Sequence, residues 1–479
     1  MAERLKDRTS TLKKNDLLTL TVENYSGEGL GIARYQGQVI FVHRGIRGET
    51  ALCRIEKVTK HLAYARAVSC TEVSPHRVES DCPYYGRCGG CDYRHMDYEE
   101  ELYAKREKVQ NAIRRLGGSD VELEAIYGAE ETDAYRNKVQ YPVSKDGAVG
   151  FFHARSHSVT DIERCRLESS DANAAAEALR IYMKRYQVSG YDELTHTGLI
   201  RHLYVRSNKA GECLICILAN AEKLPHEKEL VDIMRGACPD AVGIVLGVNR
   251  EKTNVILGKS YRTLWGSDRI SDELCGFRFS LSVPSFYQVN RRQAEVLYEK
   301  AVEYASLTGE ETVLDLYCGV GTVTSVMAAK AKRAIGAEIV PEAIEDAKEN
   351  AKQNGLHNIE FFCGDAAAIA KELSAEGLHP DVISVDPPRK GLAPEVIGHI
   401  AAMAPERVVY ISCDPATLGR DIKLFAAQGY TLTRAAAVDL FPRTQHIETV
   451  VCMINQSAQA KHHVNVGIDA EEYYRIKNK

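Results

Sequence analysis

The first part of the chain consists of short runs in which apolar and polar residues alternate. Between Leu17 and Val68 the runs LLTLTVENY, QVIFVH, TALCRIEKV and LAYARAV are separated by turns that carry glycine. Short strands with this spacing are typical of a small all-β barrel. Gly27, Gly29 and Gly31 are followed by another strand-like run and not by the helix that a phosphate-binding loop needs, so we interpret them as turn glycines.

The middle of the chain mixes helical and strand-like patterns. Apolar and charged residues recur at helical spacing over 99–116, and a pair of glycines ends that run. AYRNKVQYPVS, AVGFFHARSHSVTDI and LIRHLYVRS are strand-like, the alanine-rich run over 171–186 is helical, and GIVLGVNREKTNVILG has the pattern of a hairpin. These runs predict an α+β domain.

From Glu311 onward, strand-like and helical segments alternate. The strand-like segments are TVLDLYCGVGT, RAIGAEI, NIEFFCGD, PDVISVDPPRKG and RVVYISCDPAT. This order is typical of a doubly wound, Rossmann-like parallel sheet with helices on both faces. We therefore expect a multidomain α/β protein with an OB-like β-barrel over 1–72, a central α+β domain over 73–270, a Rossmann-like domain over 271–456 and a tail over 457–479.

Basic residues stand beside aromatic residues in the strand-like runs of the middle region. This combination suits contacts with an RNA backbone and stacking on its bases. The alternative interpretation is a solvated charged face above aromatic core residues. The basic residues are Arg136, Lys138, Arg155, His157, Arg201 and Arg206.

Length and composition agree with several soluble domains. The chain has 479 residues, 44% of them hydrophobic and 27% charged, and about 150 residues per domain predicts roughly three domains. No run approaches the roughly 18 apolar residues of a membrane span, and the start of the chain has no apolar signal core. We expect a cytoplasmic monomer without membrane contacts. The net charge of -5 excludes a uniformly basic nucleic-acid binder but allows local basic surfaces.

Three of the fourteen cysteines cluster in CPYYGRCGGC, as Cys82, Cys88 and Cys91. A closed tetrahedral site needs a fourth ligand, for which Cys165 in DIERCRLE is the candidate. Iron-sulfur ligation, zinc ligation and unligated thiols all remain open. Radical S-adenosylmethionine enzymes share a CxxxCxxC triad, whereas the first gap here has five residues, which favours a closed structural cluster. We interpret the CxxC pair in ECLICILAN as core residues.

Polar residues follow several of the predicted parallel strands. Gly319 and Gly321 come directly after a strand and open a helix, where glycine lets a ligand approach the backbone. Glu338 ends the next strand at the position that suits ribose hydroxyls. Asp365 is a candidate for the adenine amino group and Asp386 for the neighbourhood of a transferred methyl, with turn capping as the alternative for both.

Cys413 lies where the strand-like run RVVYIS ends and a helix is predicted to begin. Asp414 is a plausible N-cap and Pro415 suits the first helical position. The backbone amides and dipole of that helix then face the sulfur, which favours thiolate over thiol. The alternative is an ordinary buried cysteine.

These motifs together resemble the RNA uracil-5-methyltransferases that use S-adenosylmethionine. The resemblance is carried by FYQVN, DLYCGVGT, Glu338, DPPRKG, SCDPATLGRD and HIETV. The first domain resembles a TRAM domain, which implies RNA binding, and CPYYGRCGGC resembles the family's 4Fe-4S site, with zinc as the lesser alternative. Because this chain resembles the family in both parts, it is more similar to the members that act on 23S ribosomal RNA than to those that act on tRNA.

The resemblance implies that Cys413 is the nucleophile and Glu448 the base. The thiolate adds to uracil carbon 6, carbon 5 takes the methyl group, and the base then removes the carbon 5 proton. Because the last strand of a methyltransferase-like sheet runs antiparallel, Glu448 at its beginning should lie beside Cys413; His446 is a second candidate base. We place the methyl-donor site at Gln288, Asp315, Tyr317, Gly319, Gly321, Glu338, Asp365 and Asp386.

Two other functions remain open at this point. The same chemistry directed at tRNA is the closer alternative to 23S ribosomal RNA. The other is a catalytically inactive protein that binds RNA and senses S-adenosylmethionine, against which the joint presence of Cys413, Glu448 and Asp386 speaks.

Overall fold

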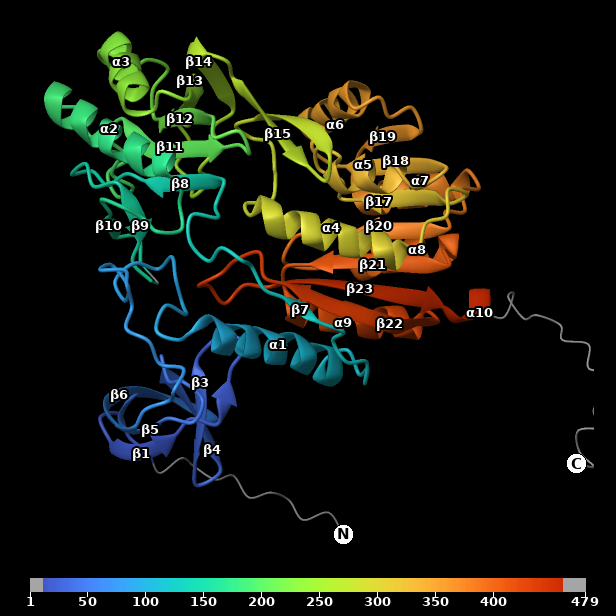
Figure 1. Cartoon of the computed structure of the whole chain (residues 1–479), viewed down its shortest axis with the longest axis horizontal. Helices are drawn as coiled ribbons and strands as arrows, with labels where there is room; N and C mark the ends of the chain where they lie inside the picture. Colours follow the sequence, from blue (N-terminus) through green and yellow to red (C-terminus); the bar gives the residue numbers. More distant parts are fainter. Residues whose placement is uncertain (1–11, 155, 460–479) are drawn as a thin grey trace, which may run out of the picture.

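A computed structural model describes residues 12–154 and 156–459 of the chain. Its N-terminal part is a six-stranded sheet in the order β1-β5-β6-β4-β3-β2 that rolls into a small barrel (Figure 1). The sequence pattern missed β3 (Gly31–Tyr35), which follows a turn in which Gly29 adopts a positive φ of 77°. The other strands are β1 (Leu17–Thr21), β2 (Asn24–Tyr25), β4 (Gln38–His43), β5 (Thr50–Val58) and β6 (Leu62–Glu72).

The predicted helix over 99–116 is α1 (Tyr98–Arg115), which lies between the barrel and the C-terminal domain (Figure 1). The side chain of Asp97 caps its N-terminus by accepting a hydrogen bond from the Glu100 backbone amide. Toward the barrel, the Tyr25 hydroxyl donates to Glu100 at 2.6 Å. On the other side, buried apolar residues of α1 join the core beneath α9 (Pro415–Ala427).

The central domain contains a five-stranded sheet in the order β14-β13-β12-β11-β8, with α2 and α3 packed on it (Figure 1). Every residue of β12 is buried, so Cys213 and Cys216 are core residues as predicted. The expected hairpin is longer than predicted, because its second strand is β14. The elements are β8 (Lys138–Pro142), β9 (Gly150–Phe152), β10 (Val159–Asp161), α2 (Ser170–Tyr186), β11 (Ile200–Ser207), β12 (Cys213–Ala219), α3 (Glu227–Ala237), β13 (Ala241–Val248) and β14 (Ser260–Gly266).

The C-terminal domain is built on an eight-stranded sheet in the order β19-β18-β17-β20-β21-β23-β22-β7. Strands β17 to β21 are parallel, and β23 runs antiparallel to β21, as predicted. The edge strand β7 (Ile126–Tyr127) comes from the segment after α1 and was not predicted. The other strands are β17 (Thr312–Leu316), β18 (Arg333–Glu338), β19 (Ile359–Cys363), β20 (Val382–Val385), β21 (Arg407–Ser412), β22 (Tyr430–Val438) and β23 (Glu448–Asn455).

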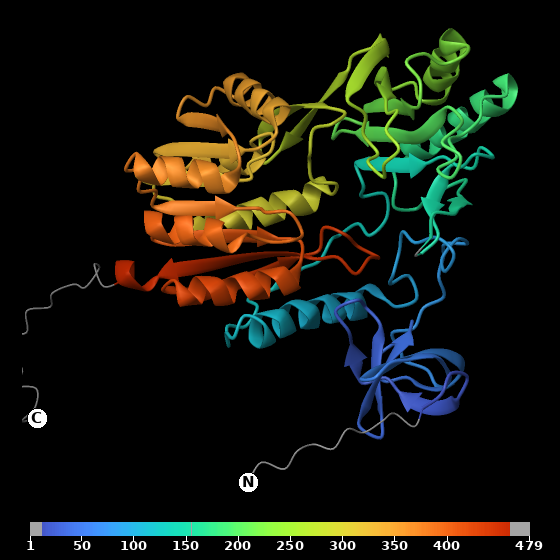
Figure 2. The same cartoon turned by 180° about the vertical axis from the view of Figure 1, so that it is seen from behind.

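Helices cover both faces of this sheet and enclose two hydrophobic cores (Figure 2). One core contains residues of α4 and α5, and the other contains residues of α7, α8 and α9. The hairpin of β15 and β16 leads from the central domain into α4 (Figure 1). These elements are β15 (Arg269–Leu274), β16 (Phe277–Ser282), α4 (Arg291–Ala305), α5 (Thr322–Ala328), α6 (Pro341–Gln353), α7 (Ala366–Ala375) and α8 (Pro394–Met403).

The described part of the chain ends in the short helix α10 (Gln456–Gln459). Most of the predicted tail over 457–479, and Arg155 among the basic residues, lie outside the described residues. Within the described residues, no helix has both the length and the apolar character that crossing a membrane requires.

Candidate active site

Cys413 lies between the end of β21 and the start of α9. Asp414 is the N-cap of this helix, and its carboxylate accepts hydrogen bonds from the backbone amides of Ala416 and Thr417, while Pro415 takes the first helical position. The predicted strand-to-helix turn is therefore confirmed. Cys413 is half-buried, so it is not a core residue.

Glu448 begins β23, the antiparallel neighbour of β21. Ser412 pairs with Thr449, which brings the residues that flank this pair, Cys413 and Glu448, to the same edge of the sheet. Glu448 is 3% exposed, and one of its carboxylate oxygens has no hydrogen-bond partner in the described part of the chain. The structure thus brings together the predicted nucleophile and the predicted base.

The acidic groups of this pocket disfavour one another's ionised forms. Burial, and then the charges of Glu448 and Asp386, raise the pKa of the Cys413 thiol to about 11. Burial and the neighbouring Asp386 also raise the pKa of Glu448 well above its usual range, and burial raises the pKa of Asp386. We predicted that the helix start favours the Cys413 thiolate; burial and the two neighbouring carboxyl groups act in the opposite direction and raise the pKa of the thiol.

Arg389 provides the positive charge that faces this acidic group. Its charge lowers the pKa of both Cys413 and Glu448, in opposition to burial. One guanidinium nitrogen lies 3.4 Å from each ring nitrogen of His446, whose pKa burial and Arg389 lower to about 4. His446 is therefore neutral at physiological pH and lies beside the arginine that offsets the acidic charges.

The turn after β17 forms a cradle of backbone groups. Gly319 and Gly321 have positive φ angles of 55° and 79°, and a side chain added at Gly319 would meet open space, so a ligand has room there. The Gly319 amide donates to the Glu338 carboxylate at 3.2 Å, and the Val340 amide donates to its other oxygen at 3.0 Å. Glu338 thus lies beside the predicted glycine turn with hydrogen-bonding capacity left for a ligand.

No sequence pattern predicted the apolar surface beside Glu338. Ile339 is 60% exposed and Val340 is 46% exposed, which is unusual for large aliphatic residues that follow a core strand. Two neighbouring exposed aliphatic side chains offer a flat ring a surface to pack against. Tyr317, which has a positive φ of 70°, is half-buried at the start of the same turn.

Gln288, in the FYQVN motif, is connected to the neighbourhood of Asp386 through Tyr298. No sequence pattern pointed to Tyr298. Gln288 is 6% exposed and hydrogen-bonds the Tyr298 side chain. Burial, and then the charge of Asp386, raise the pKa of Tyr298, which shows that the phenol lies close to that carboxyl group. Its hydroxyl also lies 3.3 Å from the Thr322 hydroxyl.

Two predicted donor ligands have structural roles in this fold. Asp315 is 1% exposed, burial raises its pKa to about 7, and it accepts a hydrogen bond from the Thr324 hydroxyl at 2.6 Å. Asp365 is exposed at the end of β19 and caps α7 by accepting from the amides of Ala367 and Ala368. Direct donor contact by either residue stays a prediction.

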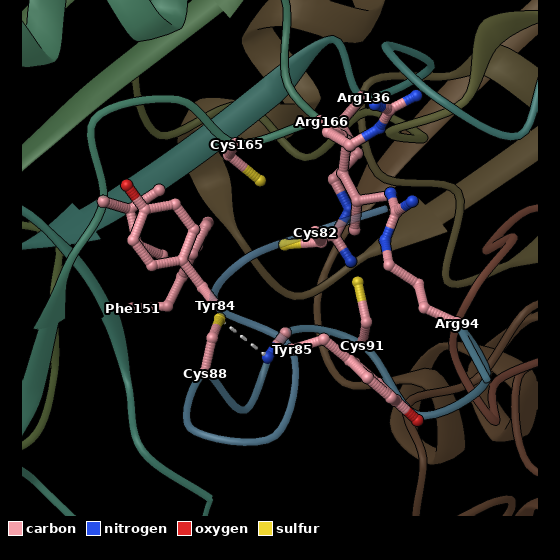
Figure 3. A pocket seen from close by; sticks show the side chains of 13 residues that line it. Cys82, Tyr84, Tyr85, Cys88, Cys91, Arg94, Arg136, Phe151, Cys165 and Arg166 are labelled. Atoms are coloured by element: carbon pink, nitrogen blue, oxygen red, sulfur yellow. Dashed lines mark hydrogen bonds between the residues drawn. The ribbon is translucent and has the colours of Figure 1, made fainter. Parts of the chain in front are cut away.

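The four predicted metal-ligating cysteines line one pocket, with their sulfur atoms around a common space (Figure 3). Cys82, Cys88 and Cys91 come from the loop after the barrel, and Cys165 comes from the loop between β10 and α2. Burial raises the pKa of Cys91 to about 11 and that of Cys165 further.

The surroundings of the cysteines fit a negatively charged metal cluster. Arg94, Arg136 and Arg166 line the same pocket (Figure 3), and such cations offset the charge of four thiolates around iron. Within the described residues, no group of three or more His, Cys, Asp or Glu side chains is arranged so that it could hold a metal ion. Metal binding by the four cysteines therefore stays a prediction.

The cysteine loop contacts the segment that leads to the catalytic base. The Asp92 and Tyr93 amides both donate to the Arg443 carbonyl, at 2.8 and 3.1 Å. The Asp92 carboxylate accepts from the Gln445 amide at 3.0 Å. Asp92 follows Cys91, and Gln445 lies three positions before Glu448, so hydrogen bonds connect the cysteine loop to the loop that leads to Glu448. No motif indicated this contact.

Comparisons with known proteins agree with this geometry. Residues 97–456 match the model of the tRNA (Uracil-5-)-methyltransferase family, and residues 13–68 match the TRAM domain. An uncharacterized RNA methyltransferase of Clostridium tetani is 42% identical over 92% of this chain and 97% of its own length. One of Halalkalibacterium halodurans is 39% identical over 92% and 98%.

A solved structure also matches across the fold. The Pyrococcus abyssi tRNA (uracil-54, C5)-methyltransferase in complex with S-adenosyl-L-homocysteine has a TM-score of 0.74 and 26% sequence identity, and the match covers 91% of this chain and 99% of that one. Fold and site together define a Rossmann-like methyltransferase that uses S-adenosylmethionine and carries an N-terminal TRAM domain. The chain belongs to the RNA uracil-5-methyltransferase family.

Proposed function

We propose that this protein methylates carbon 5 of a uridine in 23S ribosomal RNA through a covalent adduct between Cys413 and uracil carbon 6, with Glu448 as the base. One observation carries the proposal: the antiparallel pairing of β21 with β23 brings Cys413 and Glu448 to one edge of the sheet. Asp386, at the end of β20, lies close enough to raise the pKa of both.

S-adenosylmethionine, when bound, supplies a methyl group on a positively charged sulfonium. The Gly319 turn, Glu338 and Gln288 would hold it, and the buried carboxyl of Asp386 would face its positive charge. A cation there favours the ionised forms of the neighbouring acidic groups. The ligand-free pocket has raised pKa values for the same groups, so donor binding would help to generate the Cys413 thiolate.

The residues then act in sequence on the uracil. The Cys413 thiolate forms a bond to carbon 6, and the displaced electron pair makes carbon 5 nucleophilic enough to take the methyl group. Glu448 removes the carbon 5 proton, and the electrons of that C–H bond restore the ring double bond as the bond from sulfur to carbon 6 breaks. Because the adduct no longer carries a thiolate, Glu448 ionises more readily at the stage at which it must act.

The target uridine must leave its base stack to reach this pocket, at a cost of a few kcal/mol. The TRAM-like barrel and the central domain supply additional surface that can hold the RNA while the base is exposed. The four-cysteine pocket, in this proposal, holds a 4Fe-4S cluster with a structural role.

We propose 23S ribosomal RNA as the substrate because this chain combines a TRAM domain with a cysteine cluster. In this combination it resembles the family members that act on 23S ribosomal RNA. Transfer RNA is the second candidate, because the solved structure that matches the fold is described as a tRNA methyltransferase. The two substrates are distinguished by mapping 5-methyluridine in ribosomal and transfer RNA from cells with and without the gene.

The covalent mechanism is tested with two variants. Cys413→Ala should abolish methyl incorporation while S-adenosylhomocysteine binding, measured by calorimetry, is retained. Glu448→Gln should form the methylated adduct and fail to release it, so that a protein–RNA band persists on denaturing gels. Methyl transfer at the wild-type rate by Cys413→Ala would exclude this mechanism and leave only donor binding established.

A further inference from the structure

The central sheet contains two neighbouring cations that have no anionic partner among the described residues. Lys138 at the start of β8 pairs directly with Arg206 near the end of β11, so their side chains leave the same face of the sheet. Like charges directly opposite each other in a sheet are destabilising. A protein keeps such a pair at a cost unless an anion joins it.

Arg206 is the buried member of the pair, with 1% of its surface exposed. Its Nε donates to the Tyr204 hydroxyl at 2.6 Å and its Nη2 to the Ser285 carbonyl, both of which are neutral groups. Its Nη1 has no hydrogen-bond partner in the described part of the chain. A buried guanidinium with only neutral partners leaves its positive charge uncompensated.

Lys138 is the half-buried member. Burial, and then the charge of Arg206, lower its pKa to about 8, and no acidic residue counteracts this shift. Its ammonium group lies 5.7 Å from the centroid of the Phe286 ring, and Phe286 is 61% exposed. A cation and an exposed aromatic ring thus lie side by side on the surface.

Two other basic residues of the predicted RNA-contact set have anionic partners. His157 pairs with Glu193 at 2.9 Å and Arg136 lies 3.5 Å from Glu168. Arg201 donates to main-chain carbonyls of the loop after β13, and its Nε has no hydrogen-bond partner in the described part of the chain. Lys138 and Arg206 differ from these residues in that two cations lie directly opposite each other beside an exposed aromatic ring.

Lys138 and Arg206 lie next to the segment that carries Phe286 and Gln288. Asn137 precedes Lys138, and its side-chain amide donates a hydrogen bond to the Gln288 carbonyl at 2.9 Å. Its side-chain oxygen has no hydrogen-bond partner among the described residues. Its backbone amide donates to the Val289 carbonyl at 2.8 Å. The start of β8 is thus fixed to the loop that carries Phe286 and Gln288, and an anion bound by Lys138 would lie at the border of the methyl-transfer pocket.

We propose that Lys138, with Arg206 beneath it, binds a backbone phosphodiester of the substrate RNA, beside a base that packs on the Phe286 ring. The anion supplies the charge that the pair lacks, and an exposed ring next to a phosphate-binding cation is the arrangement that holds single-stranded nucleic acid. This inference rests on the proposed function, since it names a contact of the same substrate.

The test measures binding of a short fluorescent single-stranded oligouridylate, without methyl donor, at a series of salt concentrations. Lys138→Met keeps the length of the side chain and removes its charge. It should weaken binding on the order of fivefold at about 0.1 M salt and reduce the slope of log K against log salt by roughly 0.7, the value for one lost phosphate contact to a single strand. Lys138→Arg should restore the slope.

Lys145→Met is the matched control. Lys145 lies beyond the other end of β8 and its ammonium is 3.8 Å from Asp192, so its removal deletes the same charge from the same domain at a site with an anionic partner. Its salt slope should equal that of the unaltered protein. An unchanged slope for Lys138→Met, or an equal fall for Lys145→Met, overturns the phosphate contact.

A second arm separates RNA from free phosphate. Inorganic phosphate is compared with chloride at matched ionic strength for its effect on thermal stability. If Lys138→Met abolishes a phosphate-specific stabilisation but leaves the RNA salt slope unchanged, the site holds a small anion and the RNA assignment is wrong. Binding is measured without turnover, so failure of the methylation proposal would leave these outcomes interpretable.

Discussion

Cys413, the proposed nucleophile, lies near two carboxyl groups that disfavour its thiolate. Burial, together with the charges of Glu448 and Asp386, raises the pKa of the Cys413 thiol to about 11. A thiol with a raised pKa is mostly protonated at neutral pH, and only the thiolate attacks. In the proposed mechanism, Cys413 therefore depends on positive charge, from Arg389 and from a bound sulfonium, to become reactive.

The first prediction concerns pH. Because the thiolate fraction of a group with a raised pKa increases as pH increases, the rate of adduct formation should increase from pH 6 to pH 9, by up to about tenfold for each pH unit. Single-turnover rates of adduct formation in the unaltered protein measure this, because Glu448→Gln would remove one of the charges that raise the Cys413 pKa. A rate that is flat or falls over this range contradicts a raised Cys413 pKa.

The second prediction concerns Arg389, whose charge lowers the pKa of both Cys413 and Glu448. Arg389→Met should slow adduct formation by about three- to tenfold at neutral pH, because a shift of one pKa unit changes the thiolate fraction tenfold. The defect should shrink at pH 9, whereas Arg389→Lys should retain most of the activity. A defect of equal size at both pH values would indicate a role in RNA contact and not in thiolate stabilisation.

At the scale of elements, the loop between β22 and β23 is held by residues from distant parts of the chain. Lys105 of α1 lies 2.7 Å from Asp439 and 2.8 Å from Glu101, and the side chains of all three are fully buried. The Glu101 carboxylate also accepts from the Arg443 backbone amide at 2.7 Å. Helix α1 thus fixes the loop that positions Glu448.

The third prediction tests this buried ion cluster. Lys105→Met leaves the buried Asp439 carboxylate without this cation and leaves Glu101 only Arg443, at 3.6 Å, which should destabilise the protein by about 3–5 kcal/mol. Chemical denaturation followed by circular dichroism measures the loss. The triple variant Lys105→Met, Glu101→Gln, Asp439→Asn, in which all three charges are removed, should recover much of the stability; if the triple variant is as unstable as the single one, packing and not charge is responsible.

The fourth prediction concerns Asp92, which accepts from the Gln445 amide. Asp92→Ala should lower kcat by ~10- to 100-fold, because small misplacements of a catalytic group have effects of this size. Asp92→Asn keeps an acceptor oxygen and should be milder. If Asp92 acts by positioning Glu448, Asp92→Ala should also accumulate the protein–RNA adduct, while donor affinity and metal content stay unchanged.

At the scale of the whole molecule, the cysteine pocket and the donor cradle belong to different domains that meet at the catalytic loop. The cysteines come from the loop after the barrel and from the central domain, whereas the Gly319 turn belongs to the C-terminal sheet (Figure 1). The two sites share no residue. A metal cluster in this arrangement would stabilise the interface that holds the catalytic loop.

The fifth prediction separates these two sites. Protein purified without oxygen should contain iron and sulfide and absorb visible light, and Cys165→Ser should lose much of both the metal and the absorbance. S-adenosylhomocysteine should still bind this variant with near wild-type affinity, because no cysteine of the pocket reaches the donor cradle. Stoichiometric zinc without iron in the unaltered protein would contradict the cluster.

The periodicity of the sequence predicted the barrel, the helix α1 and the alternating C-terminal domain, because local apolar spacing reports which face of an element is buried. It missed β3 and β7, since β3 is a short run within a glycine-rich segment and β7 has two residues and exists only by pairing with β22. The position of Glu448 beside Cys413 was predictable because the direction of the last strand follows from the fold class.

By itself, the sequence determined the fold class, the methyltransferase motifs and the placement of Cys413 at a strand end, since these depend on residues close together in the chain. Tertiary structure decided how burial and neighbouring charges act on Cys413, that Asp92 hydrogen-bonds to the loop before Glu448, and which described cations lack anionic partners. Such properties depend on distances between residues tens to hundreds of positions apart, and burial, which sets the energy of a charge, exists only after those residues have packed.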